Sequence, residues 1–284
     1  MIYIIFNYHC DLETKNQSYM KIAIIGAGNM GGALARGIAH GSKIETHNIY
    51  VSNPSSAKLE ALKAEFPEIN TTSNNCEAIA KADLVVLAVK PWKVEEVINE
   101  IKPHIDYSYQ AIASMVGGLG IKQLSEWLSK DNAPLPATYL IIPNTAIATM
   151  NSMTFIASAR STAEKDNTLL DIFNELGEAM LIEESLIPAG TSLASCGIAY
   201  ALRYIRAAME GGIELGFRAE DAKRIVMQTL RGATELLSST NAHPEAEIDR
   251  VTTPGGLTIK GLNAMEAAGF TNSVIEGLRA STRR

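Results

Sequence analysis

Short hydrophobic runs alternate with helical patterns along the chain before Glu184. Leu84–Val89 is apolar almost throughout, which is typical of a strand in a parallel sheet covered on both faces. Met30–Ala39 carries apolar residues at helical spacing, and Pro67 ends a second helical pattern over Ala57–Phe66. Such alternation predicts an α/β fold with a doubly wound parallel sheet. The predicted strands are Ile22–Ile25, Ile49–Val51, Leu84–Val89, Gln110–Met115, Tyr139–Ile142, Thr154–Ser158 and Ala179–Ile182.

The strand pattern stops after Glu184, and two long helical stripes follow. The first lies within Leu186–Leu215 and the second runs from Ala222 to Leu237. Both are rich in small residues, which let helices approach closely. We expect an all-α domain that buries itself partly against another copy of the chain, with ordinary packing within one chain as the alternative. The predicted domains are residues 20–183 and 184–284.

The first nineteen residues differ from this pattern. Met1–Phe6 is a short apolar run without a basic leader, so it makes a poor signal peptide. Met20 stands directly before the first strong strand and would serve as a start. We therefore expect residues 1–19 to be a disordered tail or a mis-assigned start.

Composition narrows the functional classes. The chain has 284 residues, 46% hydrophobic and 20% charged, as in ordinary soluble globular proteins. Its net charge of −6 argues against a nucleic-acid partner, and no apolar run reaches the roughly 18 residues that span a membrane. Cys10, Cys76 and Cys196 have neither metal-ligand spacing nor a disulfide pattern. We expect a cytoplasmic protein without a bound metal.

A glycine-rich turn follows the first strand. The first glycine of a G-x-G-x-x-G pattern permits a tight turn, the second lets a pyrophosphate approach, and the third lets helix and strand pack. Here a strand precedes the pattern and a helix follows it, which favours a dinucleotide site over a purely structural turn. The segment consists of Gly26, Ala27, Gly28, Asn29, Met30 and Gly31.

The end of the second strand indicates which dinucleotide binds. NAD sites usually place a carboxylate there for the ribose 2′-OH. This chain has Ser52 and Asn53 instead, followed by Ser55, Ser56 and Lys58, which offer donors and a charge to a 2′-phosphate. We predict NADP(H), with NAD(H) as a second option. The alternative is a plain loop with a helix N-cap at Ser55 or Ser56.

Two further turns follow predicted strands and should face the same ligand, because ligands bind at the carboxyl ends of parallel strands. One holds Ala88, Val89, Lys90 and Pro91, where Lys90 could equally be a solvated charge. The other holds Asn144, which could bind a nicotinamide amide or cap a turn.

A Pro-Gly-Gly turn within Val251–Leu262 lies between helical patterns and carries three threonines. If a helix begins at about Thr258, its free N–H groups face the turn and form an anion site. The alternative is a turn with a threonine N-cap.

No histidine lies where it could serve as an acid or base for an alcohol substrate; His40, His47, His104 and His243 fall near element ends or in loops. An imine substrate needs less acid–base assistance, since it is already an electrophile once it is protonated.

These motifs together resemble the pyrroline-5-carboxylate reductase family over residues 20 to about 280. Four segments carry the resemblance: Gly26–Gly31, Ala82–Pro91, Pro143–Thr145 and Val251–Leu262, which His243-Pro244 precedes. The resemblance implies an NAD(P)H-dependent oxidoreductase that reduces the ring imine of 1-pyrroline-5-carboxylate to L-proline, the last step of proline biosynthesis. It further implies a Rossmann domain followed by a helical domain that intertwines in a dimer, often within larger rings.

The resemblance also implies roles for individual residues. Asn75 corresponds to an asparagine that contacts the cofactor, and Ser114, Met115 and Val116 correspond to a segment beside the nicotinamide. The substrate carboxylate would bind at Thr253, Gly256, Leu257 and Thr258. Thr258 would hydrogen-bond the ring nitrogen and help its protonation.

Departures from the family pattern keep two other functions open. Where the family usually has Ser-Gly-Ser-Gly-Pro-Ala-Tyr, this chain has Ala194–Tyr200, with Ile198 in place of the proline. Leu140 stands where many members have arginine, and Leu257 is larger than the usual residue. One alternative is a reductase of another cyclic imine acid. The other is an NADP-binding regulator without turnover.

Overall fold

The computed structural model describes residues 20–130 and 133–282, so the predicted tail over residues 1–19 lies outside the described residues. The chain divides into two compact units. One runs up to Tyr139 and includes Ala159–Leu176, and the other comprises Leu140–Ser158 and the chain from Gly177 onward. The predicted domain division at residue 183 stays a prediction.

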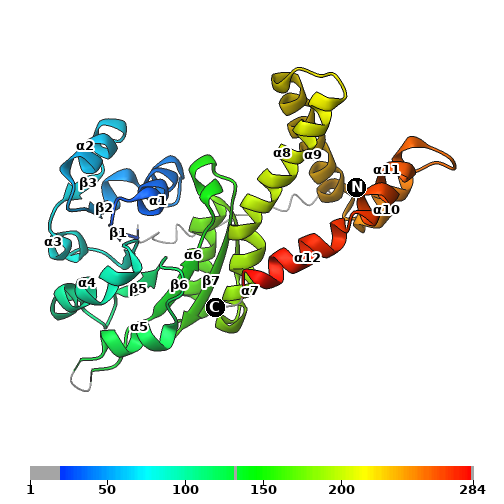
Figure 1. The fold of residues 1–284 in the computed structure, drawn as a ribbon. Coiled ribbons are helices and arrows are strands. Elements are labelled where there is room, and N and C mark those ends of the chain that lie inside the picture. The colour runs from blue at the N-terminus through cyan, green and yellow to red at the C-terminus, as the bar shows by residue number, and fades with distance from the viewer. Residues whose placement is uncertain (1–19, 131–132, 283–284) are drawn as a thin grey trace, which may run out of the picture. The chain divides into compact units, whose positions relative to one another are not determined.

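The first unit contains a parallel sheet of strand order β3-β2-β1-β4-β5 (Figure 1). Pairing is parallel throughout, and Ile25 is in register with both Ser52 and Leu87. This confirms the doubly wound sheet. The strands are β1 (Ile22–Ile25), β2 (Ile49–Ser52), β3 (Asn70–Thr72), β4 (Leu84–Leu87) and β5 (Ala111–Ser114), and β6 (Thr138–Ile142) runs from the first unit into the second.

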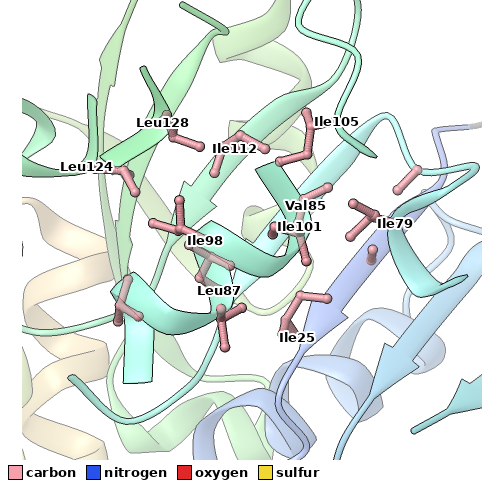
Figure 2. Close-up of a cluster of buried hydrophobic side chains, with 14 of the residues drawn as sticks. Ile25, Ile79, Val85, Leu87, Ile98, Ile101, Ile105, Ile112, Leu124 and Leu128 are labelled. Carbon is pink, nitrogen blue, oxygen red and sulfur yellow. The ribbon is translucent and has the colours of Figure 1, made fainter. Parts of the chain in front are cut away.

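Helices of the first unit bury apolar stripes against this sheet. In α4, Val94, Val97, Ile98 and Ile101 recur at helical spacing and are buried. Figure 2 shows Ile98 and Ile101 beside Val85 and Leu87 of β4, in one cluster of buried side chains. The helices are α1 (Asn29–His40), α2 (Ser56–Glu65), α3 (Asn75–Ile79), α4 (Val94–Ile101), α5 (Ile121–Leu128) and α6 (Ala163–Asn174).

The second unit has the parallel pair β7 (Ser152–Ala159) and β8 (Gly177–Leu181), followed by helices (Figure 1). In this part of the described chain no strand follows Leu181, as predicted. A π-helical turn over Thr191–Cys196 connects two of the helices. The helices are α7 (Ile187–Gly190), α8 (Gly197–Glu214), α9 (Ala219–Thr240), α10 (Pro244–Arg250), α11 (Leu257–Ala267) and α12 (Phe270–Ala280).

The helical stretch Glu184–Glu214 changes the expectation about membranes. It is long and apolar enough to cross one by length and composition, although no uninterrupted apolar run signals this in the sequence. Only 6% of its most apolar window is buried. The same features fit a helix whose apolar face packs against another protein surface.

Candidate active site

The strands of the first unit bring most predicted cofactor residues to one edge of the sheet. Ile25, Ser52, Leu87 and Ser114 end β1, β2, β4 and β5, and the register aligns them in a single row. The glycine-rich turn, the Ser52–Lys58 loop and the Ala88–Pro91 turn all leave from this row. This is the edge at which parallel α/β sheets bind ligands.

Each glycine of the turn has the geometry that its predicted role requires. Gly26 has φ +108°, and an added Cβ would lie 2.6 Å from the carbonyl oxygen of Ala88. An added Cβ at Gly31 would lie 2.8 Å from Cβ of Ala88 and would clash with the carbonyl oxygen of Gly26. Among the residues that the structure describes, and leaving aside the two chain neighbours of Gly28, no atom lies within 4 Å of a Cβ added there. The structure therefore leaves open space at the one glycine assigned to a ligand.

Helix α1 begins directly behind that space. Its N-cap is Gly28, which offers no side-chain cap, and its first turn has no acidic residue. The N–H of Gly32 makes the first helical bond, to the carbonyl of Gly28 at 2.8 Å. The preceding N–H groups of Asn29 and Met30 lack an intrahelical partner by position, so this helix end suits an anion.

The predicted donors at the end of β2 are bonded inside the protein. The buried Ser52 hydroxyl donates to Oδ1 of Asn75 at 2.7 Å. The Asn75 amide in turn donates to Oε2 of Glu100 at 2.8 Å. Asn53 Oδ1 accepts the N–H of Ala27 at 3.0 Å, and its amide donates to the carbonyl of Ser55 at 3.2 Å.

Exposed groups follow on the same loop. Ser55, Ser56 and Lys58 are exposed at the start of α2, whose N-cap Ser55 makes no side-chain cap bond. Ser55 thus holds the N-cap position named in the plain-loop alternative, but without the capping bond. These groups and the helix N-terminus fit a phosphate.

The turns after β4 and β5 also contain predicted cofactor residues, and these differ in their exposure to solvent. Ala88 and Val89 are half-buried, Lys90 is exposed, and Pro91 begins a 3₁₀ turn. The buried Ser114 hydroxyl accepts the N–H of Val116 at 3.2 Å, so it shapes the turn after β5.

Asn144 lies in the second unit and caps the 3₁₀ turn Thr145–Thr149. Its Oδ1 accepts the N–H of Ala146 at 3.0 Å, and its amide donates to the carbonyl of Ala194 in the π-helical turn at 3.3 Å. The structure therefore shows the capping bond that one interpretation expected, and the contact between Asn144 and a nicotinamide stays a prediction.

The Pro-Gly-Gly segment forms an exposed turn that leads into α11. Gly255 has φ +70°, and the N–H of Gly256 bonds the carbonyl of Thr253 at 2.9 Å. The N-cap of α11 is Gly256, so the threonine N-cap alternative is wrong, and the expected start at Thr258 is late by one residue. Helix α11 has no side-chain cap and no acid in its first turn.

The residues predicted to bind the substrate therefore lie together at the start of α11. Leu257 is 86% exposed, and Thr258 is also exposed in the first turn of α11. The N–H groups of this first turn can bind a carboxylate, with the Thr258 hydroxyl beside them. Nearby, Nδ1 of His243 accepts the N–H of Glu245 and caps α10, which is a structural role.

Nothing in the sequence signals that Glu100 lies beside the predicted cofactor residues Ser52 and Asn75. Glu100 lies near the end of α4, 25 residues after Asn75. Only the fold brings its carboxylate to the Asn75 amide. Its charge also adds to burial in raising the pKa of Cys76.

Comparisons with known proteins agree with this arrangement. Residues 184–284 match the family model described as pyrroline-5-carboxylate reductase dimerisation, and residues 21–111 match the one described as NADP oxidoreductase, coenzyme F420-dependent. Pyrroline-5-carboxylate reductase 2 of Dictyostelium discoideum is 38% identical, over 96% of this chain and 94% of that protein. Pyrroline-5-carboxylate reductase 1 of the same organism is 39% identical over 92% of this chain, which spans about half (48%) of that protein.

Solved structures show the same likeness. A pyrroline-5-carboxylate reductase from Coxiella burnetii superposes with a TM-score of 0.85 at 26% identity, covering 93% of this chain and 96% of that one. The Plasmodium falciparum enzyme with NADP bound gives a TM-score of 0.81 at 28% identity, covering 93% of this chain and 95% of that one.

Proposed function

The chain belongs to the pyrroline-5-carboxylate reductase family, and from this premise we propose that it reduces 1-pyrroline-5-carboxylate to L-proline with NADPH. One observation carries the proposal: the uncapped start of α11 presents Thr258 and free N–H groups after a Pro-Gly-Gly turn. A protein that only binds a dinucleotide has no use for a second anion site of this kind.

The cofactor residues fit NADPH. The open space at Gly28 and the N-terminus of α1 would receive the diphosphate. Ser55, Ser56 and Lys58 would hold the 2′-phosphate at the start of α2, whose first turn has no acid. When bound, NADPH supplies a hydride. The described loop has no carboxylate at Ser52–Lys58 that would repel a 2′-phosphate.

The chain's own groups orient the substrate. Reduction adds a hydride to the imine carbon and a proton to the ring nitrogen. The N–H groups at the start of α11 hold the substrate carboxylate, and this fixes the ring. The Thr258 hydroxyl hydrogen-bonds the ring nitrogen and assists its protonation.

The assay is NADPH oxidation by the purified protein with 1-pyrroline-5-carboxylate and with the six-membered homologue. Faster turnover of the five-membered imine supports the proposal. Faster turnover of the six-membered imine would favour the alternative substrate that the Ala194–Tyr200 departures suggest. NADPH binding without any oxidation would favour a regulator, and a preference for NADH would overturn the cofactor assignment.

The dimerisation family model indicates self-association. We propose that a second copy covers the helical stretch Glu184–Glu214, where Leu202 is 58% exposed, and that the protein works in the cytoplasm without a membrane or nucleic-acid partner. Sedimentation of protein extracted without detergent tests this. Leu202→Asp should shift the population toward monomer; a detergent requirement for extraction would contradict the proposal.

A further inference from the structure

Asn53 joins three segments that surround the proposed cofactor site. Its side chain bonds Ala27 of the glycine-rich turn and Ser55 at the start of α2, and its own N–H donates to the carbonyl of Thr72, the last residue of β3, at 3.2 Å. The neighbouring N–H of Gly26 bonds the carbonyl of Ser52 at 2.8 Å. The glycine-rich turn is thus tied to the end of β2 by two adjacent bonds.

The orientation of the Asn53 amide is fixed by its partners. A backbone N–H can only donate and a backbone carbonyl can only accept, so Oδ1 must face Ala27 and Nδ2 must face Ser55. Asn53 is 8% exposed, which leaves little of it to meet a ligand. Serine is too short to span both groups, and aspartate would set a carboxylate oxygen against the Ser55 carbonyl. An amide satisfies both partners at once.

The two segments that Asn53 connects have different proposed tasks. Ala27 belongs to the turn for the diphosphate, and Ser55 opens the loop for the 2′-phosphate. We propose that Asn53 is a positioning residue that sets the spacing between these two subsites and does not itself hold the 2′-phosphate. This rests on the proposed use of NADPH.

The proposal predicts a pattern of affinities that direct contact would not give. A positioning residue acts on the diphosphate subsite, which NADPH and NADH share, so its loss should weaken the binding of both cofactors. A residue that binds the 2′-phosphate directly affects the binding of NADPH alone, because NADH lacks this phosphate. The exposed Lys58 provides the matched control, because it lies in the loop proposed to hold the 2′-phosphate, which NADH lacks.

The experiment measures the Kd of NADPH and of NADH by fluorescence titration, without an imine substrate. Asn53→Ala should raise both Kd values by a similar factor, on the order of tenfold. Lys58→Ala should raise the Kd of NADPH by roughly threefold to tenfold and leave that of NADH unchanged. Asn53→Asp keeps the acceptor for Ala27, so its Kd for NADH should lie between those of the wild type and Asn53→Ala. Its Kd for NADPH should stay high, because the new carboxylate would repel the 2′-phosphate.

A rise confined to NADPH in Asn53→Ala would overturn the proposal and make Asn53 a direct ligand. Circular dichroism checks that this variant folds. If it does not, the folded Asn53→Asp variant decides, because a wild-type Kd for NADH despite the lost bond to the Ser55 carbonyl would overturn the positioning role. The titration measures cofactor binding without turnover. A protein that fails to reduce 1-pyrroline-5-carboxylate would therefore contradict the proposed function and leave the test of Asn53 intact.

Discussion

Alanine at Gly31 should destabilise the fold and alanine at Gly28 should not, although the two glycines stand three residues apart in one motif. An added Cβ at Gly31 would lie 2.8 Å from Cβ of Ala88 and would clash with the Gly26 carbonyl oxygen. That oxygen cannot retreat easily, because the N–H of Ala27 in the same peptide unit is bonded to Oδ1 of Asn53. Helix α1 would have to move outward, away from a core in which Leu34 is fully buried.

The loss of stability expected for Gly31→Ala follows from this overpacking. Inserting a methyl into a closely packed contact costs about 3 kcal/mol at the upper end of the usual range. For a unit of this size, that lowers the midpoint of thermal unfolding by about 6–12 °C. A Cβ at Gly28 meets no atom of the other described residues within 4 Å, and φ is −70° there, so the midpoint of Gly28→Ala should equal that of the wild type or rise slightly.

Ligand binding should separate the two variants again. NADPH at about 100 times its Kd stabilises the wild type by about 2.7 kcal/mol, which raises the midpoint by about 5–11 °C. In Gly28→Ala the methyl fills the space for the diphosphate, so this rise should disappear. Thermal unfolding with and without NADPH is the assay. A normal NADPH-dependent rise in Gly28→Ala, or a wild-type midpoint in Gly31→Ala, would refute the reasoning.

Three further predictions concern single side chains. Thr258→Ala should lower kcat by on the order of 100-fold with an unchanged Kd for NADPH, and a wild-type kcat would remove this hydroxyl from the mechanism. Partial burial raises the pKa of Glu175, but hydrogen bonds from Ser42 and Lys43 outweigh it and lower the pKa below its ordinary 4.5. Glu175→Gln should therefore melt earlier than the wild type above pH 4.5, and the gap should close as the pH falls below that value; a constant gap would contradict this linkage. Asn144→Asp keeps the cap but loses the donor to Ala194, so urea unfolding should show a loss of about 1–2 kcal/mol, and no loss would exclude the bond.

Most strands could be predicted because strands buried on both faces contain little besides apolar residues. β4 shows this, since Leu84–Leu87 is buried throughout. β3 could not be predicted in this way. Its residues Asn70–Thr72 are polar and half-buried, and parallel pairing with Tyr50–Ser52 in β2 defines it. A strand specified by a neighbour's backbone leaves no period in its own side chains.

Among the helices, too, some features could be predicted from the sequence and others could not. The start of α11 was predicted to within one residue, because a Pro-Gly-Gly turn cannot continue a helix. The π-helical turn Thr191–Cys196 gave no comparable signal. The residues of this turn would also fit an ordinary helix, and contacts from distant residues, such as the Asn144 amide, accompany the altered winding.

The cofactor site shows why residue types alone mislead. Ser52 and Asn53 have the chemistry of 2′-phosphate donors, and their lack of charge was the reason for predicting NADP(H). The structure gives that neutrality a second cause, since Asn53 must satisfy a backbone N–H and a backbone carbonyl at once. A neutral residue at this position would therefore be required whichever dinucleotide binds. We therefore expect the discrimination between NADPH and NADH to come from groups that remain exposed, of which Lys58 carries the only charge in the Ser52–Lys58 loop.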